Sequence, residues 1–109
     1  MADGIGTFEQ AVLLAVIRLD DEAYGRAIVD EVQKRGRHAV AVGAVHATLV
    51  RLEDKGMLSS RVAAGTPRRS GRPRRYYTIQ PAGVRALRDA RQTMANLWRG
   101  VRLPLIGEV

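Results

Sequence analysis

The residues with the clearest chemistry in this chain are arginines gathered in one short stretch. Five lie within eight positions: Arg68, Arg69, Arg72, Arg74 and Arg75. Glycines and prolines separate them, as is typical of a mobile loop. A guanidinium group stays charged, and its planar fork of N–H donors matches the oxygens of a phosphate. The stretch therefore predicts a basic loop that lies along a nucleic-acid backbone.

Two short runs of strand-like composition flank this loop, Leu58–Val62 and Arg75–Ile79. They predict a β-hairpin that carries the arginines at its tip and on its returning strand. Successive side chains of a strand point to opposite faces, so we expect one of Tyr76 and Tyr77 in the core and the other exposed.

The net charge of +7 comes from the same part of the chain. No acidic residue lies between Lys55 and Asp89, whereas the first 55 residues carry nine acids and seven bases. A surplus that served solubility would be scattered, but a concentrated one attracts a polyanion such as DNA, RNA or an acidic membrane surface. Charge alone does not choose among these partners, and our expectation of double-stranded DNA comes from the third helix and from the resemblance of the chain to a known family.

Other functions find little support in the composition. With 109 residues and 46% hydrophobic content the chain suits one folded domain. It has no cysteine, and its two histidines, His38 and His46, have no partner at metal-ligand spacing. No phosphate-binding loop or nucleophile elbow is present. We therefore expect no enzyme, cofactor or metal, and a cytoplasmic protein without a signal peptide or membrane span.

Helical periodicity predicts two helices in the first part of the chain. The first begins at Thr7, with capping-box spacing to Gln10, and is apolar on more than one face. The second follows the acids Asp20–Glu22, which we interpret as helix caps rather than as a catalytic pair. Gly36 is expected to end it.

A third helix is predicted from about Gly43 to Gly56. Its core stripe consists of Val45, Leu49 and Leu52. Small side chains on the remaining surface would let the helix backbone approach bases in a major groove. Arg51 could reach a phosphate or a guanine edge, or pair with a local acid. The residues of this helix that we expect to face DNA are Ala44, His46, Ala47, Thr48, Val50 and Arg51.

A last helix is predicted to begin near Pro81, and the chain after Arg99 reads as a tail. The first and last helices together offer more apolar surface than one small domain needs, which predicts a homodimer. The expected dimer interface consists of Leu87, Met94, Leu97, Trp98 and Val101.

These elements make a mainly α fold with a small β-hairpin, a winged helix-turn-helix with a three-helix core, a two-stranded wing and a C-terminal dimerisation helix. We expect residues 1–80 to form the DNA-binding domain and 81–109 the dimerisation helix and tail, in one compact unit. The sequence resembles the PadR family of bacterial transcriptional regulators, in its compact form with one C-terminal helix. The matching motifs are Ala23-Tyr24-Gly25, residues 49–58 and residues 71–83.

Three positions depart from the family's pattern. His46 stands where a tyrosine is usual, and Ala44 where a threonine or serine is usual. Gln80 replaces a threonine that normally caps the last helix. These differences affect how bases are read rather than the fold.

The resemblance implies a homodimer that binds an inverted-repeat operator and represses a nearby gene. The wing arginines would meet phosphates or a narrow minor groove. Some relatives respond to phenolic or flat hydrophobic compounds, so two copies of Trp98 could hold a small aromatic ligand, or Trp98 could be a packed core residue. Tyr24 could contact a phosphate or pack in the core. The rival functions are an RNA-binding module and a winged-helix protein–protein adaptor.

Overall fold

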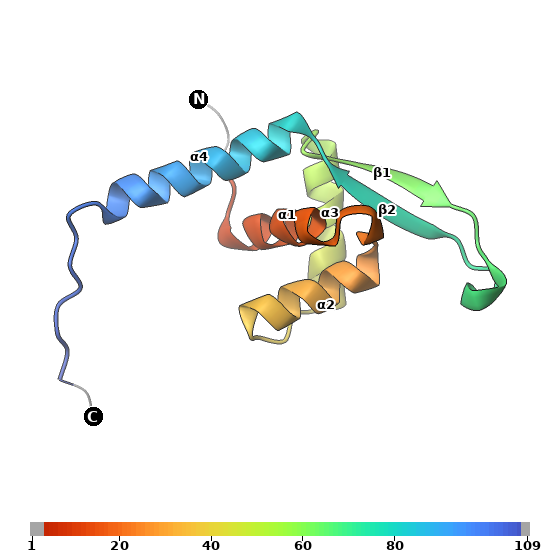
Figure 1. The fold of residues 1–109 in the computed structure, drawn as a ribbon, viewed down its shortest axis with the longest axis horizontal. Helices are drawn as coiled ribbons and strands as arrows, with labels where there is room; N and C mark the ends of the chain where they lie inside the picture. Colours follow the sequence, from red (N-terminus) through yellow and green to blue (C-terminus); the bar gives the residue numbers. More distant parts are fainter. Residues whose placement is uncertain (1–3, 108–109) are drawn as a thin grey trace.

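A computed structural model describes residues 4–107 as four α-helices and one antiparallel hairpin (Figure 1). The winged-helix fold expected from the sequence is confirmed, because three helices precede the hairpin and one follows it. The elements in chain order are α1 (Thr7–Leu19), the short 3-10 helix η1 (Asp20–Glu22), α2 (Gly25–Gly36), α3 (Val42–Asp54), β1 (Leu58–Ala63), the 3-10 helix η2 (Pro67–Arg69), β2 (Arg74–Ile79) and α4 (Pro81–Trp98).

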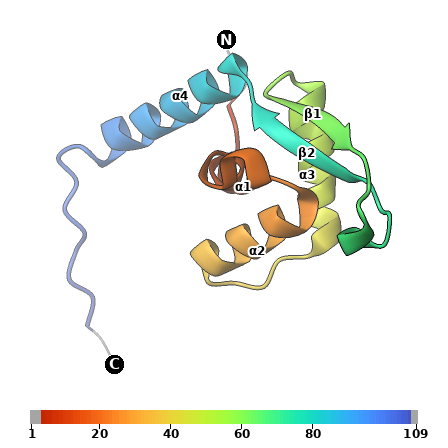
Figure 2. The ribbon, with the colours of Figure 1, turned by 45° about the vertical axis from the view of Figure 1, so that its right-hand side comes forward.

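The core lies where α1, α2 and α3 meet under the base of the hairpin. Each helix contributes apolar residues at helical spacing, so that one face of each is removed from water. The largest fully buried side chains are Leu13, Ile28, Leu49 and Leu52. Figure 2 shows α1 nearly end-on, between α4 on one side and α2 on the other.

The hairpin is joined to the helical core by its second strand. β1 and β2 pair in register from Leu58 opposite Ile79 to Ala63 opposite Arg74. The backbone N–H of Tyr77 donates to the carbonyl oxygen of Ala23 at 2.8 Å, next to an isolated bridge between Tyr24 and Tyr76. Tyr77 is buried, as the alternation predicts for one of the two tyrosines, but Tyr76 is half-buried rather than exposed. The chain just before α2 therefore holds the base of the wing.

The first half of α4 packs on the domain and the second half extends away from it (Figure 1). Gly83 permits the close approach, because a Cβ there would lie 2.6 Å from the carbonyl oxygen of Met57. The radius of gyration is 16.7 Å, against about 13 Å for a compact domain of this length. The protruding helix and the wing, at opposite ends of the molecule, account for the difference.

Helix ends differ from the sequence-based expectations. In α1 the carboxylate of Glu9 accepts from the Gly6 N–H at 3.2 Å, so the predicted box of Thr7 and Gln10 is wrong. The acids of η1 form their own turn, and α2 begins only after Tyr24, so they do not cap it. Helix α2 does end at Gly36, as expected, although the left-handed conformation that follows it falls on Arg37, at φ 61°.

Candidate nucleic-acid interface

Helix α3, which the sequence predicts to face DNA and which we call the recognition helix, presents a surface of mostly small side chains. Its buried stripe comprises Val45, Thr48, Leu49 and Leu52. Five of the six residues predicted to face DNA are exposed: Ala44, His46, Ala47, Val50 and Arg51. The helix could therefore lie in a groove without long side chains holding its backbone away from the bases.

Thr48 corrects the prediction. It is only 2% exposed, so it cannot face DNA. Its hydroxyl oxygen instead accepts a hydrogen bond from the Arg51 guanidinium at 3.1 Å. Helical spacing places Thr48 outside the core stripe, but in the structure it is buried together with Val45, Leu49 and Leu52.

Arg51 points toward α1 and pairs with an acid there. Its Nε lies 3.7 Å from a carboxylate oxygen of Glu9, which also accepts from Lys55 Nζ at 3.1 Å. Partial burial would raise the pKa of Glu9, but the hydrogen bonds from Lys55 and Gly6 and the two cations outweigh burial and lower it. Glu9 therefore stays ionised and ties the C-terminal end of the recognition helix to α1.

The wing tip holds three of the predicted arginines. Arg68 and Arg72 are exposed. Arg69 is turned back into the loop, where it donates to the carbonyl oxygens of Ala64 at 2.6 Å and of Arg72 at 3.2 Å. Gly65 closes this loop, because any Cβ there would overlap the backbone of Gly71. Two guanidinium groups of the tip are thus directed at solvent and one has a structural role.

At the wing base, Arg74 and Arg75 lie on opposite faces of β2. The Arg74 guanidinium stacks on the ring of Tyr24, with its carbon 3.8 Å from the ring centroid. Arg75 donates to the hydroxyl of Ser60 at 2.9 Å, and Ser60 donates to the Glu53 carboxylate of α3 at 2.7 Å. Each of the two arginines is therefore held by a different part of the domain.

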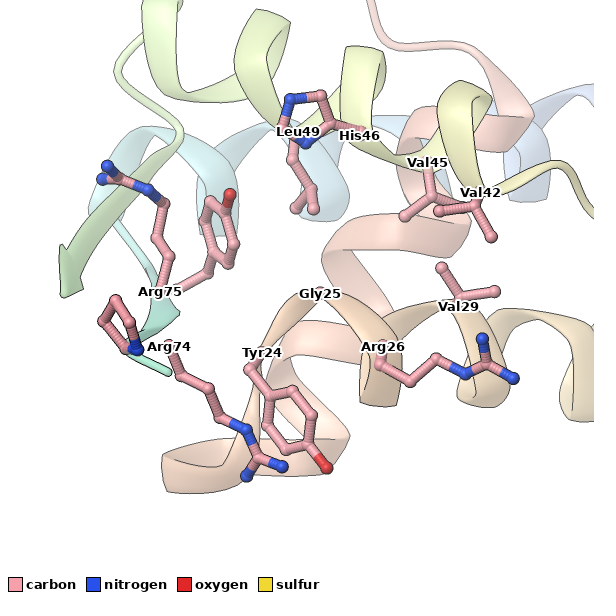
Figure 3. A pocket seen from close by; sticks show the side chains of 12 residues that line it. Tyr24, Gly25, Arg26, Val29, Val42, Val45, His46, Leu49, Arg74 and Arg75 are labelled. Carbon is pink, nitrogen blue, oxygen red and sulfur yellow. The ribbon is translucent and has the colours of Figure 1, made fainter. Parts of the chain in front are cut away.

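Both arginines nevertheless line one hollow of about 500 Å³ between the start of α2, the recognition helix and the wing. Figure 3 shows Tyr24 and Arg74 at one side of it, with His46 and Arg75 at the other. Positive charge and the exposed recognition helix meet here. The backbone of Gly25 also lines the hollow, at the N-terminus of α2, where helix dipoles favour anions. The arrangement suits a phosphate chain that runs between helix and wing.

The residues predicted for the dimer interface occupy the far part of α4 and the start of the tail. Leu87 is half-buried against its own domain. Met94, Leu97, Trp98 and Val101 are all at least half exposed in the single chain. Trp98 is therefore not a core residue of its own domain. It lines a groove of about 680 Å³ between α4 and α1, opposite Leu14 and Ile17.

Two further findings concern other kinds of site. Residues 4–107 contain no group of three or more histidine and acidic side chains placed to hold a metal ion. Within the same range, none of the helices combines the length and the apolar character needed to cross a bilayer.

Comparison with known proteins decides the family. Residues 13–89 match the transcriptional regulator PadR-like family. The chain belongs to that family. Over 82 residues it is 35% identical to the transcriptional regulator Rv3488 of Mycobacterium tuberculosis, covering 75% of this chain and 72% of that protein. As a PadR-like protein it is a DNA-binding transcriptional regulator and not an enzyme.

Solved structures agree with this membership. A PadR-like transcription factor from Bacteroides fragilis superposes with a TM-score of 0.71 at 27% identity, covering 86% of this chain and 85% of that one. A PadR family regulator from Eggerthella lenta gives a TM-score of 0.65 at 30% identity, covering 82% and 75%.

Sequence reasoning missed several residues that hold the wing and the recognition helix. The Glu9 carboxylate accepts a hydrogen bond from Lys55, which is 46 positions away in the sequence. No local pattern reveals a contact over such a separation. Ser60 and Glu53 were not singled out, although both flank the turn between α3 and β1. Arg61, whose guanidinium carbon lies 4.9 Å from the ring centroid of Tyr76, could have been found from its place opposite Tyr76 in the hairpin.

Proposed function

We propose that this PadR-like regulator binds an inverted-repeat operator as a homodimer and represses transcription there. The observation that carries the proposal is the hollow where the exposed recognition helix meets Arg74 and Arg75. Helix α3 would enter the major groove while the wing follows the adjacent backbone. The proposed DNA contacts are Ala44, His46, Ala47, Val50, Arg51, Arg68, Arg72, Arg74 and Arg75.

Two features support a dimer. The chain exposes 8123 Å² of surface, against about 6000 Å² for a compact monomer of its mass. Large apolar side chains of the second half of α4 and of the tail are at least half exposed, and Leu14 and Ile17 of α1 are almost half exposed beside the same groove. We propose that a second copy covers this surface through α4, which would place two recognition helices about one helical turn of DNA apart.

Competition binding tests the choice of partner. A labelled duplex bound to the protein should be displaced by unlabelled duplex and not by equal amounts of single-stranded RNA. Equal displacement by the RNA would favour an RNA-binding module. Binding to an acidic protein without measurable binding to any nucleic acid would favour an adaptor. Sedimentation of the complex should give two chains for each operator, and transcription from an operator-bearing template should fall when the protein is added.

A small aromatic ligand is a second proposal, favoured by the exposure of Trp98. The groove of about 680 Å³ falls within the usual size of ligand pockets, about 300–1000 Å³. A flat aromatic compound could stack on the indole ring and release the protein from DNA. Titration of such compounds should quench the emission of Trp98, the only tryptophan. Absence of quenching across a broad set would remove this proposal and leave DNA binding untouched.

A further inference from the structure

Tyr24 connects two parts of the proposed DNA-binding surface. It is the residue directly before α2, and its ring meets the ring of Tyr76 edge-on, with centroids 5.7 Å apart. The guanidinium carbon of Arg74 lies over the ring of Tyr24, 3.8 Å from its centroid. Arg61 lies over Tyr76. Two arginines and two tyrosines thus form one continuous cluster that joins both strands of the hairpin to the start of α2.

Contact with the ring of Tyr24 fixes the position of the Arg74 guanidinium before any ligand binds. A guanidinium whose flat face is covered by an aromatic ring can still donate hydrogen bonds from its edge. A hydrogen bond to the side chain of Tyr76, together with nearby Glu22, raises the pKa of Arg74 and keeps it charged. None of the ion pairs between residues 4 and 107 involves Arg74, so no carboxylate holds its remaining donors. The tip arginines Arg68 and Arg72 have no such aromatic support among these residues and must lose more side-chain freedom on binding.

We propose that Tyr24 is a positioning residue that holds Arg74 at the mouth of the hollow, where the guanidinium edge binds one DNA phosphate. This inference rests on the proposed DNA binding. It adds that the phosphate contact of Arg74 is pre-organised, and that the ring of Tyr24 orders it. Tyr24 acts through its ring, not through its hydroxyl. Arg74 supplies the charge, and the ring reduces the entropy that Arg74 loses when it binds.

The test measures the dissociation constant for a duplex as a function of salt for four single variants and one double variant. Tyr24→Phe keeps the ring and should bind within twofold of wild type. Tyr24→Leu removes the ring and should bind about twofold to fivefold more weakly per protomer, with the salt slope unchanged.

Arg74→Ala should weaken binding further and flatten the slope by about 0.9 per protomer. Arg74→Lys keeps the charge but loses the planar stack, and should resemble Tyr24→Leu.

The double variant distinguishes positioning from a general structural role. In the Arg74→Ala background, Tyr24→Leu should cause no further loss of affinity, because its effect passes through Arg74. An undiminished loss there, or a loss with Tyr24→Phe equal to that with Tyr24→Leu, would overturn the proposal. If Tyr24→Leu fails to fold, Arg74→Lys decides: wild-type affinity in that variant would also overturn the proposal.

Arg102→Ala, in the tail, serves as the charge control. Failure of wild type to bind any duplex would instead refute the proposed function.

Discussion

Removing the two exposed arginines of the wing tip should change the salt dependence of DNA binding in a measurable way. Arg68 and Arg72 are exposed, unlike Arg69, whose side chain is bonded within the loop. Phosphates bound by arginines release condensed counterions, and each such contact contributes about 0.9 to the slope of log affinity against log salt. The double variant Arg68→Ala/Arg72→Ala should therefore lose slope in proportion to the contacts removed.

The magnitude depends on how many wings engage the duplex. Two arginines on each of two protomers make four contacts, so the slope should fall by about 3.6. Between 50 and 200 mM salt, wild type should then lose about 150-fold more affinity than the variant. A fall of about 1.8 would mean two contacts, made either by one wing alone or by one arginine of each wing. The single variants Arg68→Ala and Arg72→Ala distinguish these cases, because in the first each would lower the slope by about 0.9 and in the second only one of them would lower it, by about 1.8.

Fluorescence anisotropy of a labelled duplex at several salt concentrations provides the measurement. The matched control is Arg99→Ala/Arg102→Ala, which removes the same charge at the opposite end of the molecule (Figure 1). The control should shift affinity slightly and leave the slope within experimental error. An unchanged slope in the tip variant, or an equal change in the control, would show that general charge and not the wing binds the backbone.

Four further substitutions test the packing and the interface. Gly83→Ala places a Cβ against a backbone carbonyl and should destabilise by about 1–3 kcal/mol in a thermal melt, whereas Gly36→Ala, which meets open space, should stabilise by about 0.5–1 kcal/mol. Glu9→Gln removes a carboxylate whose pKa is lowered in the folded state. Its ionised form stabilises the fold fully above about pH 4.3, and this stabilisation is lost as the pH falls through the lowered pKa. Urea midpoints of wild type and this variant should therefore converge on acidification, and a constant gap would contradict the assignment. Met94→Glu should raise the dissociation constant of the dimer at least tenfold in sedimentation equilibrium. Diluting wild type should shift Trp98 emission to longer wavelength. A monomer at every concentration would refute the dimer.

The elements of the fold were predictable because their signals are local. The apolar spacing of Val45, Leu49 and Leu52 identifies α3, and the cluster of glycines and prolines identifies the wing tip. The alternation of Tyr76 and Tyr77 assigns one ring to the core before any coordinates are known. Such patterns need only the period of a helix or strand.

The details of the site depend on contacts between distant residues, which no local pattern contains. Helix α2 begins after Tyr24 because that residue pairs with Tyr76 of the hairpin, so the preceding acids cannot serve as its caps. Arg51 hydrogen-bonds to Thr48 of its own helix, but the acid that it pairs with is Glu9 on another helix. Thr48, which helical spacing places outside the core stripe, is buried. Local spacing therefore located the helices but not the surroundings and partners of their polar side chains.

Selection of bound sequences from random duplexes tests the central claim most directly. Wild-type protein should enrich an inverted repeat whose half-sites lie about 10 base pairs apart from centre to centre, because a two-fold dimer presents its recognition helices one helical turn apart. Enrichment of no sequence, or of a single unpaired half-site, would contradict the account of a symmetric, operator-binding regulator.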